Sequence, residues 1–213
     1  SGNYERAQLA LIEARAIEQR TTLDSIDGEL LLNVEGVLRY VQGKYGEAID
    51  TLAAVLDETV RKYGSSHPTT AGLLNYIGLA VMGNGDFTRA RPYLERALAV
   101  SERVLGPDHL ATATSLNNLG SLLQDQGDLA GARPYYERAL AVWERVLGPD
   151  HPDTGMSAGN LAGLHEALGE YNKAVPLRER ALEIHLTVFG ENHPITATSL
   201  NNLGSLLQDQ GDL

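Results

Sequence analysis

The chain has 213 residues, a formal net charge of −11 at pH 7 and no cysteine. The acidic excess repels the phosphates of nucleic acids and anionic membrane surfaces, so we expect neither as a partner. The lack of cysteine excludes disulfides and thiolate metal sites, and it allows a reducing compartment. No apolar stretch approaches the roughly 20 residues that a membrane-spanning helix needs. We therefore expect a soluble, cytoplasmic protein.

The chain repeats itself with a period of 42 residues. Histidines recur at this interval at His67, His109, His151 and His193, and each opens a near-copy of the same block. Residues 112–129 and 196–213 are identical over eighteen positions. A fixed period of this size predicts units that cannot bury their apolar faces alone and must stack on their neighbours.

The period also divides the chain in order. A second helix of a truncated unit occupies 1–21, four complete units occupy 22–63, 64–105, 106–147 and 148–189, and a first helix occupies 190–213. We expect a single solenoid domain that is a fragment of a longer repeat protein. The last helix would leave four apolar side chains without a cover: Leu200, Leu203, Leu206 and Leu207. This predicts head-to-tail self-association through the truncated ends.

Each unit is predicted to consist of two helices. In unit 106–147, apolar residues at spacings of three and four define a first helix from about 109 to 126. Gly127-Asp128 ends it, and a second apolar stripe defines a helix over about 129–147. Gly148-Pro149 then stops the second helix.

Small residues recur in the middle of the predicted first helices, at Gly36, Gly78, Gly120, Ala162 and Gly204. Because glycine destabilises a helix interior by about 1 kcal/mol relative to alanine, its recurrence indicates close helix packing. Small residues recur on the second helices as well, at Ala48, Ala90, Ala132 and Ala174. We expect small-on-small contact between the two helices. Three prolines predict a late start or a slight bend of the second helix: Pro92, Pro134 and Pro176.

The pattern of small, large and aromatic residues resembles the tetratricopeptide repeat (TPR). The positions that carry the resemblance are Leu119, Gly120, Ala132, Tyr136 and Ala139. The 42-residue period, the LNNLG sequence and the run at 134–140 are similar to the long-helix variant of kinesin light chains, which also occurs in sensor regions of signal-transducing ATPases. The resemblance implies an all-α, right-handed superhelical solenoid of antiparallel helix pairs with about ten helices, whose first helices line a concave groove.

By this resemblance, the peptide-binding groove is lined by polar residues of the first helices. The candidates are Asn33, Asn75, Tyr76, Asn117, Asn118, Asn160, Asn201, Asn202, Gln124, Asp125 and Glu166. Asparagine is a poor helix former, and its amide both donates and accepts, so a row of amides can pair with the backbone of an extended peptide. Alternatively, the asparagines bond across adjacent helices or solvate an exposed face. Asn118, Asn160 and Asn202 share one phase and are the strongest candidates.

The candidate groove residues include no lysine or arginine. Family members that bind acidic motifs do so with basic residues in the groove, so we expect a neutral or basic protein or peptide partner. Asp125 and Glu166 would make the groove negative, unless they are ordinary solvated carboxylates.

The periodic histidines are too far apart for a metal site, because stacked helix layers are roughly 10 Å apart and zinc needs its ligands within about 2.1 Å. We expect them to mark helix starts, and we expect neither a metal nor a cofactor. His165 takes the place of Leu123 and is predicted to lie in or near the core, whereas His185 is predicted to be a variable surface residue.

No sequence motif of a phosphate-binding loop, a cysteine nucleophile, a zinc protease or a nucleophile elbow is present, so we predict that the chain is not an enzyme. The leading hypothesis is a protein–protein interaction scaffold that binds an extended peptide in the groove. The alternative is a self-associating or regulatory repeat arm of a larger signalling ATPase or protease, without a free peptide ligand.

Overall fold

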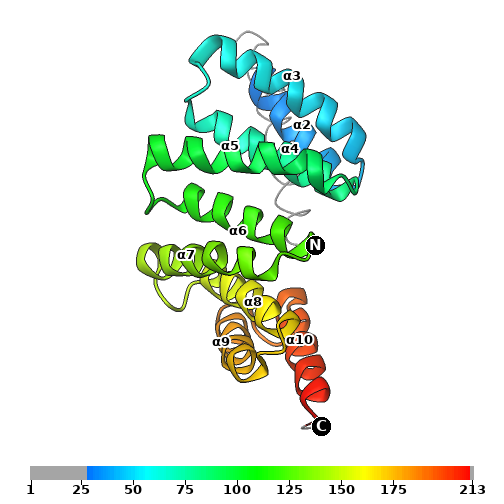
Figure 1. Ribbon diagram of the computed structural model, residues 1–213, viewed down its shortest axis with the longest axis vertical. Helices are drawn as coiled ribbons and strands as arrows, with labels where there is room; N and C mark the ends of the chain where they lie inside the picture. Colours follow the sequence, from blue (N-terminus) through cyan, green and yellow to red (C-terminus); the bar gives the residue numbers. More distant parts are fainter. Residues whose placement is uncertain (1–27, 212–213) are drawn as a thin grey trace. The chain divides into compact units, whose positions relative to one another are not determined.

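The computed structural model describes residues 28–211, with side chains from residue 32 onward. This part of the chain contains nine helices and no strand (Figure 1). None of these helices is both long enough and apolar enough to cross a membrane. The helix predicted over 1–21 lies outside the described residues. The chain divides into two compact units, 1–106 and 107–213.

The first unit contains four described helices. They are α2 (Gly28–Val41), α3 (Tyr45–Tyr63), α4 (Pro68–Gly83) and α5 (Phe87–Leu105). Each helix packs against the next, and α2 also contacts α4. The unit therefore shows the predicted pattern of helix, tight turn and helix.

The second unit contains five helices. They are α6 (Leu110–Asp125), α7 (Leu129–Leu147), α8 (Pro152–Ala167), α9 (Tyr171–Phe189) and α10 (Pro194–Gln210). Here too each helix packs against the next along the chain. The bounds of α6 and α7 agree with the predicted helices over 109–126 and 129–147. The prediction of an all-α fold built from helix pairs is confirmed.

The periodic histidines are N-caps of the first helices. The Nδ1 atom of His109 accepts a hydrogen bond of 3.1 Å from the backbone N–H of Ala111, and His67, His151 and His193 cap their helices in the same way. An N-cap acceptor satisfies one of the amide groups that the first turn of a helix leaves unpaired. The prediction that these histidines mark helix starts is confirmed.

The turns between helices depend on glycine and aspartate. Gly127, between α6 and α7, has a φ of 81°, and Gly148, after α7, has a φ of 95°. Residues with a side chain rarely adopt this region. The Asp128 side chain then accepts a hydrogen bond of 2.9 Å from the N–H of Gly131 and caps α7. The sequence GD at the end of a first helix therefore sets both the turn and the start of the next helix.

The small residue in the middle of the first helix makes room for a large side chain of the second. A Cβ atom added to Gly78 would lie 2.5 Å from Cδ2 of Leu94, which is fully buried. The same contact joins Gly36 to Leu52 at 2.6 Å and Gly120 to Tyr136 at 3.2 Å. The predicted close approach is therefore confirmed, but the residue that meets the glycine is a large one four positions after the recurrent alanine.

The expectation of a late start for the helices that contain proline was wrong. α5, α7 and α9 each begin five residues before their proline, at Phe87, Leu129 and Tyr171. The prolines are exposed, and so are the residues four positions earlier, whose carbonyl groups lose their helical partner. Since water can bond to these carbonyl groups, the helix continues through the proline.

Two glycines of α4 test the packing contact. Gly78→Ala forces Leu94 to move, so we expect the free energy of unfolding to fall by about 1–2 kcal/mol, as the overpacking penalty exceeds the gain in helix propensity. Gly72→Ala is the control, because Gly72 lies in the same helix, is exposed and has no atom near its added Cβ. It should raise stability by up to about 1 kcal/mol. Urea unfolding followed by circular dichroism measures both, and equal effects would contradict the packing argument.

Candidate functional site

The second unit contains a pocket between α8, α9 and α10, with a volume of about 310 Å³. This is the lower end of the range for ligand pockets. We call it the α8–α10 pocket; its lining is Gly155, Met156, Gly159, Asn160, Arg178, Ala181, His185, Ile195, Thr198, Ser199 and Asn202. Two of the predicted groove residues, Asn160 and Asn202, therefore lie in the same pocket.

An ion pair between α9 and α8 borders this pocket. Arg178 Nε donates to Glu166 Oε1 over 2.6 Å, and Arg178 Nη2 donates to Glu166 Oε2 over 3.0 Å. Only 13% of the Arg178 side chain and 27% of the Glu166 side chain are exposed. Two parallel bonds fix the plane of the guanidinium group. Within the described part of the chain, Arg178 Nη1 makes no hydrogen bond, so it is the donor left for a ligand.

Three glycines of α8 face side chains of α9, and two of them, Gly155 and Gly163, are closely approached. Gly155, Gly159 and Gly163 follow one another at intervals of four residues and therefore share a helix face. An added Cβ would lie 3.6 Å from Arg178 Nη1 at Gly159 and 3.3 Å from Arg178 Nη2 at Gly163. At the equivalent positions, α6 has Ala113, Asn117 and Ser121. Two of these glycines, Gly155 and Gly159, line the pocket, where longer side chains would take up space.

His185 is buried at the base of this arrangement, with 3% of its surface exposed. Its Nδ1 lies 2.7 Å from Ser199 Oγ and its Nε2 lies 3.4 Å from the carbonyl oxygen of Pro152. The prediction that His185 is a surface residue was wrong. Its ring fills space next to Gly155 of α8, where an added Cβ would lie 3.0 Å from His185 Nε2. Burial lowers the pKa of His185, aided by His193 and opposed by the Pro152 carbonyl, so the ring is neutral at pH 7.

Sequence reasoning missed Arg178, because it took groove residues only from the first helices. The signal was present in the repeat. Arg178 occupies the position of Leu52, Leu94 and Tyr136, which pack against the mid-helix glycine in the other helix pairs. A charged residue at a core position of a repeat indicates a local role that differs from that of the other copies.

The structure brings some predicted groove residues of the second unit together. Asn160 Nδ2 on α8 donates to Asn117 Oδ1 on α6 over 2.9 Å, which is the cross-helix contact that the alternative interpretation expected. Asn118 and Asn202 are half-buried, whereas Asn201 is exposed. Two further candidates of this unit, Gln124 and Asp125, lie at the end of α6. Gln124 is half-buried and Asp125 is exposed. Partial desolvation of the Asp125 carboxyl group raises its pKa.

The remaining candidates, Asn33, Asn75 and Tyr76, lie in the first unit. Asn75 is buried in α4, and Asn33 Oδ1 in α2 is buried without a hydrogen-bond partner among the described residues. Tyr76 is 37% exposed and meets Tyr40 of α2 edge to face, with ring centroids 6.4 Å apart. This aromatic contact connects the first helices α2 and α4.

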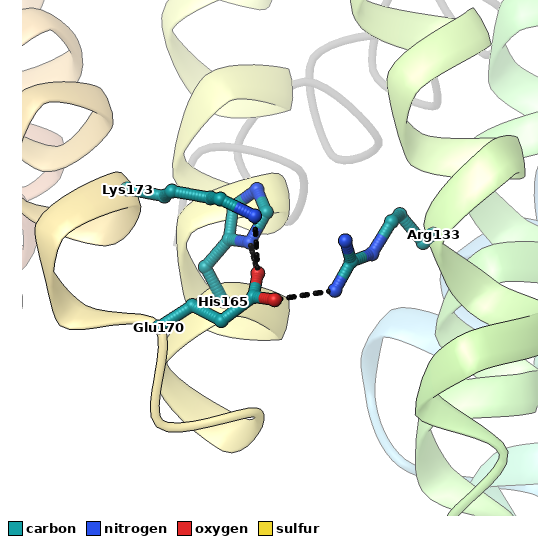
Figure 2. A network of polar contacts seen from close by, with 4 residues as sticks. All are labelled: Arg133, His165, Glu170 and Lys173. Carbon is teal, nitrogen blue, oxygen red and sulfur yellow. Dashed lines mark hydrogen bonds and ion pairs between the residues drawn. The ribbon is translucent and has the colours of Figure 1, made fainter.

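A polar cluster connects the three helices α7, α8 and α9 (Figure 2). Glu170, at the start of α9, accepts hydrogen bonds from Arg133 of α7 over 2.8 Å and from Lys173 over 3.2 Å, and its Oε2 lies 2.6 Å from Nδ1 of His165 in α8. Asp86 and Asp128 occupy the equivalent position and cap their own helices. Glutamate is longer by one methylene group, makes no capping bond here and reaches the neighbouring helices instead.

His165 is 6% exposed, which confirms its predicted place in the core. Together with the other residues of the cluster, His165 determines the pKa of the Glu170 carboxyl group. The hydrogen bonds from Arg133, then from His165 and Lys173, lower the pKa of Glu170 to about 2 from its ordinary value of 4.5.

Within the described residues, no group of three or more His, Asp or Glu side chains could hold a metal ion.

Comparisons with known proteins identify the fold. Family models described as "Tetratricopeptide repeat" match residues 33–103, 69–139, 115–184 and 156–213. The crystal structure of BtubC (BKLC) from P. vanneervenii is similar with a TM-score of 0.76 and 23% identity, over 99% of this chain and 84% of that one. No curated protein sequence matches the chain.

Two further solved structures are similar. A putative kinesin light chain of Podosopora anserina with nearly identical TPR-like repeats gives a TM-score of 0.71 and 24% identity, over 85% of this chain and 86% of that one. A Rap protein complexed with Competence and Sporulation Factor gives 0.72 and 17%, over 98% of this chain and 62% of that one. At these identities the likeness shows the fold alone.

The cluster predicts a pH dependence of stability. Because the pKa of Glu170 is lower in the folded chain, its contribution is complete above about pH 4.5 and is lost as the pH falls towards 2. The difference in the free energy of unfolding between wild type and Glu170→Gln should therefore be constant near neutral pH and shrink between pH 4.5 and 2. Urea unfolding at a series of pH values measures it. A difference that does not change with pH would contradict the assignment.

Proposed function

The chain belongs to the tetratricopeptide repeat family, and from this premise we propose that it is a protein–protein interaction scaffold without catalytic activity. Its ligand is an extended peptide or a segment of a partner protein that lies across the first helices. The observation that carries the proposal is the α8–α10 pocket, which has the Asn160 and Asn202 amides in its lining. A largely apolar pocket that carries amides on the two successive first helices α8 and α10 is where a peptide side chain can enter while its backbone meets the amides.

The asparagine amides supply the chemistry that binds a peptide backbone. Each amide has two N–H donors and an oxygen acceptor, which match the C=O and N–H groups of an extended chain. Asn118, Asn160 and Asn202 follow one another on α6, α8 and α10. The Rap protein structure, which contains a complex with Competence and Sporulation Factor, supports a role in binding for this fold.

Charge favours a neutral or basic partner. The net charge is −11, and Asp125 adds an exposed carboxylate near the end of α6. Arg178 does not reverse this preference, because Glu166 compensates its charge within the same ion pair. Long-range attraction therefore accelerates the approach of basic partners and opposes that of acidic ones.

The alternative function is self-association as a repeat arm of a larger signalling protein. One observation favours it: Leu200 of α10 is 47% exposed, and Leu203 and Leu207 beside it are only half-buried. An apolar face of this kind suits the second helix of another repeat. This mode of assembly needs no free peptide.

A peptide selection tests the leading proposal. Wild-type protein is used to select binders from a displayed library of random peptides, and their affinities are then measured for Asn118→Ala, Asn160→Ala, Asn202→Ala combined in one variant. Because a hydrogen bond contributes about 0.5–1.5 kcal/mol, affinity should fall by roughly 10-fold to 1000-fold. The thermal midpoint of the variant is measured alongside.

The matched control replaces three exposed asparagines outside the first helices, Asn84, Asn172 and Asn192, by alanine, and it should keep wild-type affinity. Equal losses in both triple variants would remove the site assignment. If no peptide is selected, and assembly seen by sedimentation disappears in Leu200→Lys, the alternative function replaces the proposal.

A further inference from the structure

We propose that the α8–α10 pocket is a specificity site for a carboxamide side chain, that of glutamine or asparagine, with Arg178 Nη1 as its donor and Asn160 Oδ1 as its acceptor. The proposal deepens the proposed function, since it rests on a peptide that crosses the first helices. It concerns one helix pair, α8–α9, which differs from the other pairs in the residues that face the pocket.

Arg178 is energetically unfavourable at its position in the helix pair. In the other helix pairs, its position holds Leu52, Leu94 or Tyr136, which fill the space against a mid-helix glycine. Burying an ion pair in place of an apolar side chain gains little stability and often loses some. Gly155 and Gly159 in the pocket lining and Gly163 next to Arg178 Nη2 weaken the helix α8. A residue set that opposes stability at several positions together is typical of a binding site.

The polar atoms that the pocket leaves for a ligand match a carboxamide. Glu166 occupies Nε and Nη2 of Arg178, so Nη1 remains as a donor. Asn160 uses Nδ2 for its bond to Asn117, so its Oδ1 remains as an acceptor. The Asn202 amide makes no hydrogen bond within the described part of the chain. A donor and an acceptor that line one pocket match the C=O and NH₂ of a carboxamide.

The charges around the pocket also favour a neutral polar side chain. Arg178 and Glu166 cancel, and the nearby His185 is neutral, so the pocket has no net charge. A carboxylate would bring an unbalanced negative charge close to Glu166 and would face the Asn160 oxygen, with which it cannot form a hydrogen bond. An ammonium or guanidinium group would face the Arg178 guanidinium. A neutral polar side chain avoids both penalties.

The remaining lining and the size of the pocket also suit a glutamine side chain. Met156, Ala181 and Ile195 provide apolar contacts for the methylene groups of a side chain. Met156 is 45% exposed, and its flexible side chain can adapt to what enters. A volume of about 310 Å³ holds one glutamine side chain with bound water.

The test uses small probes, which need no partner. Blocked glutamine (N-acetyl-glutamine-N-methylamide) is titrated into the full chain labelled with nitrogen-15, together with the blocked forms of glutamate and leucine in separate titrations. Blocked glutamine should shift the backbone amide signals of Gly155, Gly159 and Gly163 with a dissociation constant on the order of millimolar. Blocked glutamate and blocked leucine should bind at least about five-fold more weakly, as expected for one unpaired polar group.

Two variants separate a role in binding from a role in folding. The double variant Arg178→Leu, Glu166→Gln places the residues of Leu94 and Gln124 in this pair, so it should fold with a thermal midpoint at or above that of the wild type and lose binding of blocked glutamine. Arg180→Leu is the control on the same helix. Arg180 bonds to Glu144 and to the Pro149 carbonyl and does not line the pocket, so this variant should bind the probe like the wild type.

The proposal is overturned if blocked glutamine shifts none of the three glycines, if blocked glutamate or blocked leucine binds as well as blocked glutamine, or if the double variant keeps the binding. The proposed function fails separately: blocked glutamine would then bind as predicted, but the peptide library would give no binder. Conversely, peptides that depend on the asparagines without any preference for glutamine or asparagine at one position would support the scaffold and contradict the carboxamide site.

Discussion

The contact between a mid-helix glycine and a large side chain of the next helix determines how each helix pair packs. Without a Cβ at Gly78, Leu94 can reach the backbone of α4, and the pair closes around a buried leucine. Gly36 with Leu52 and Gly120 with Tyr136 repeat this geometry. Because the glycine must face its partner helix, the opposite face of each first helix is directed away from the pair. The polar residues of the first helices are therefore available for contacts outside it, as in the bond from Asn160 of α8 to Asn117 of α6.

The pair α8–α9 keeps this framework but changes the residues in it. Ala162 replaces the glycine, Arg178 replaces the large apolar residue, and Glu166 holds the guanidinium in place. Stability that the core contact supplies elsewhere has to come from another source here. The Glu170 cluster is one such source, because its hydrogen bonds join α7, α8 and α9. The α8–α10 pocket and the Glu170 cluster therefore both involve the helix pair α8–α9.

The sequence predicted most of the fold, and the reason is that each helix boundary depends on local chemistry. His109 at the N-cap, Gly127 in the turn and Asp128 at the next N-cap act on their own neighbours, so a single copy of the repeat reveals them. The site could be predicted only in part. Asn160 and Asn202 follow from the face that they share, but Arg178 and His185 come from the second helix and line the pocket beside Gly155 and Gly159 of α8. That is a property of two helices together, and a periodicity averaged over copies assigns such residues to the core or to the surface.

The identities and differences between the repeats indicate which function they serve. Identity over eighteen residues between 112–129 and 196–213 indicates that α6 and α10 act as interchangeable parts of a scaffold, which suits an assembly role. α8 lies between these two copies and differs from both along the face that borders the pocket. If the repeats served only to stack, the leucine or tyrosine of the other pairs would give the most stable fold at position 178. An arginine whose side chain is only 13% exposed and that keeps one donor free suits a ligand instead, so this pair favours binding, and the identical copies provide the frame that holds it.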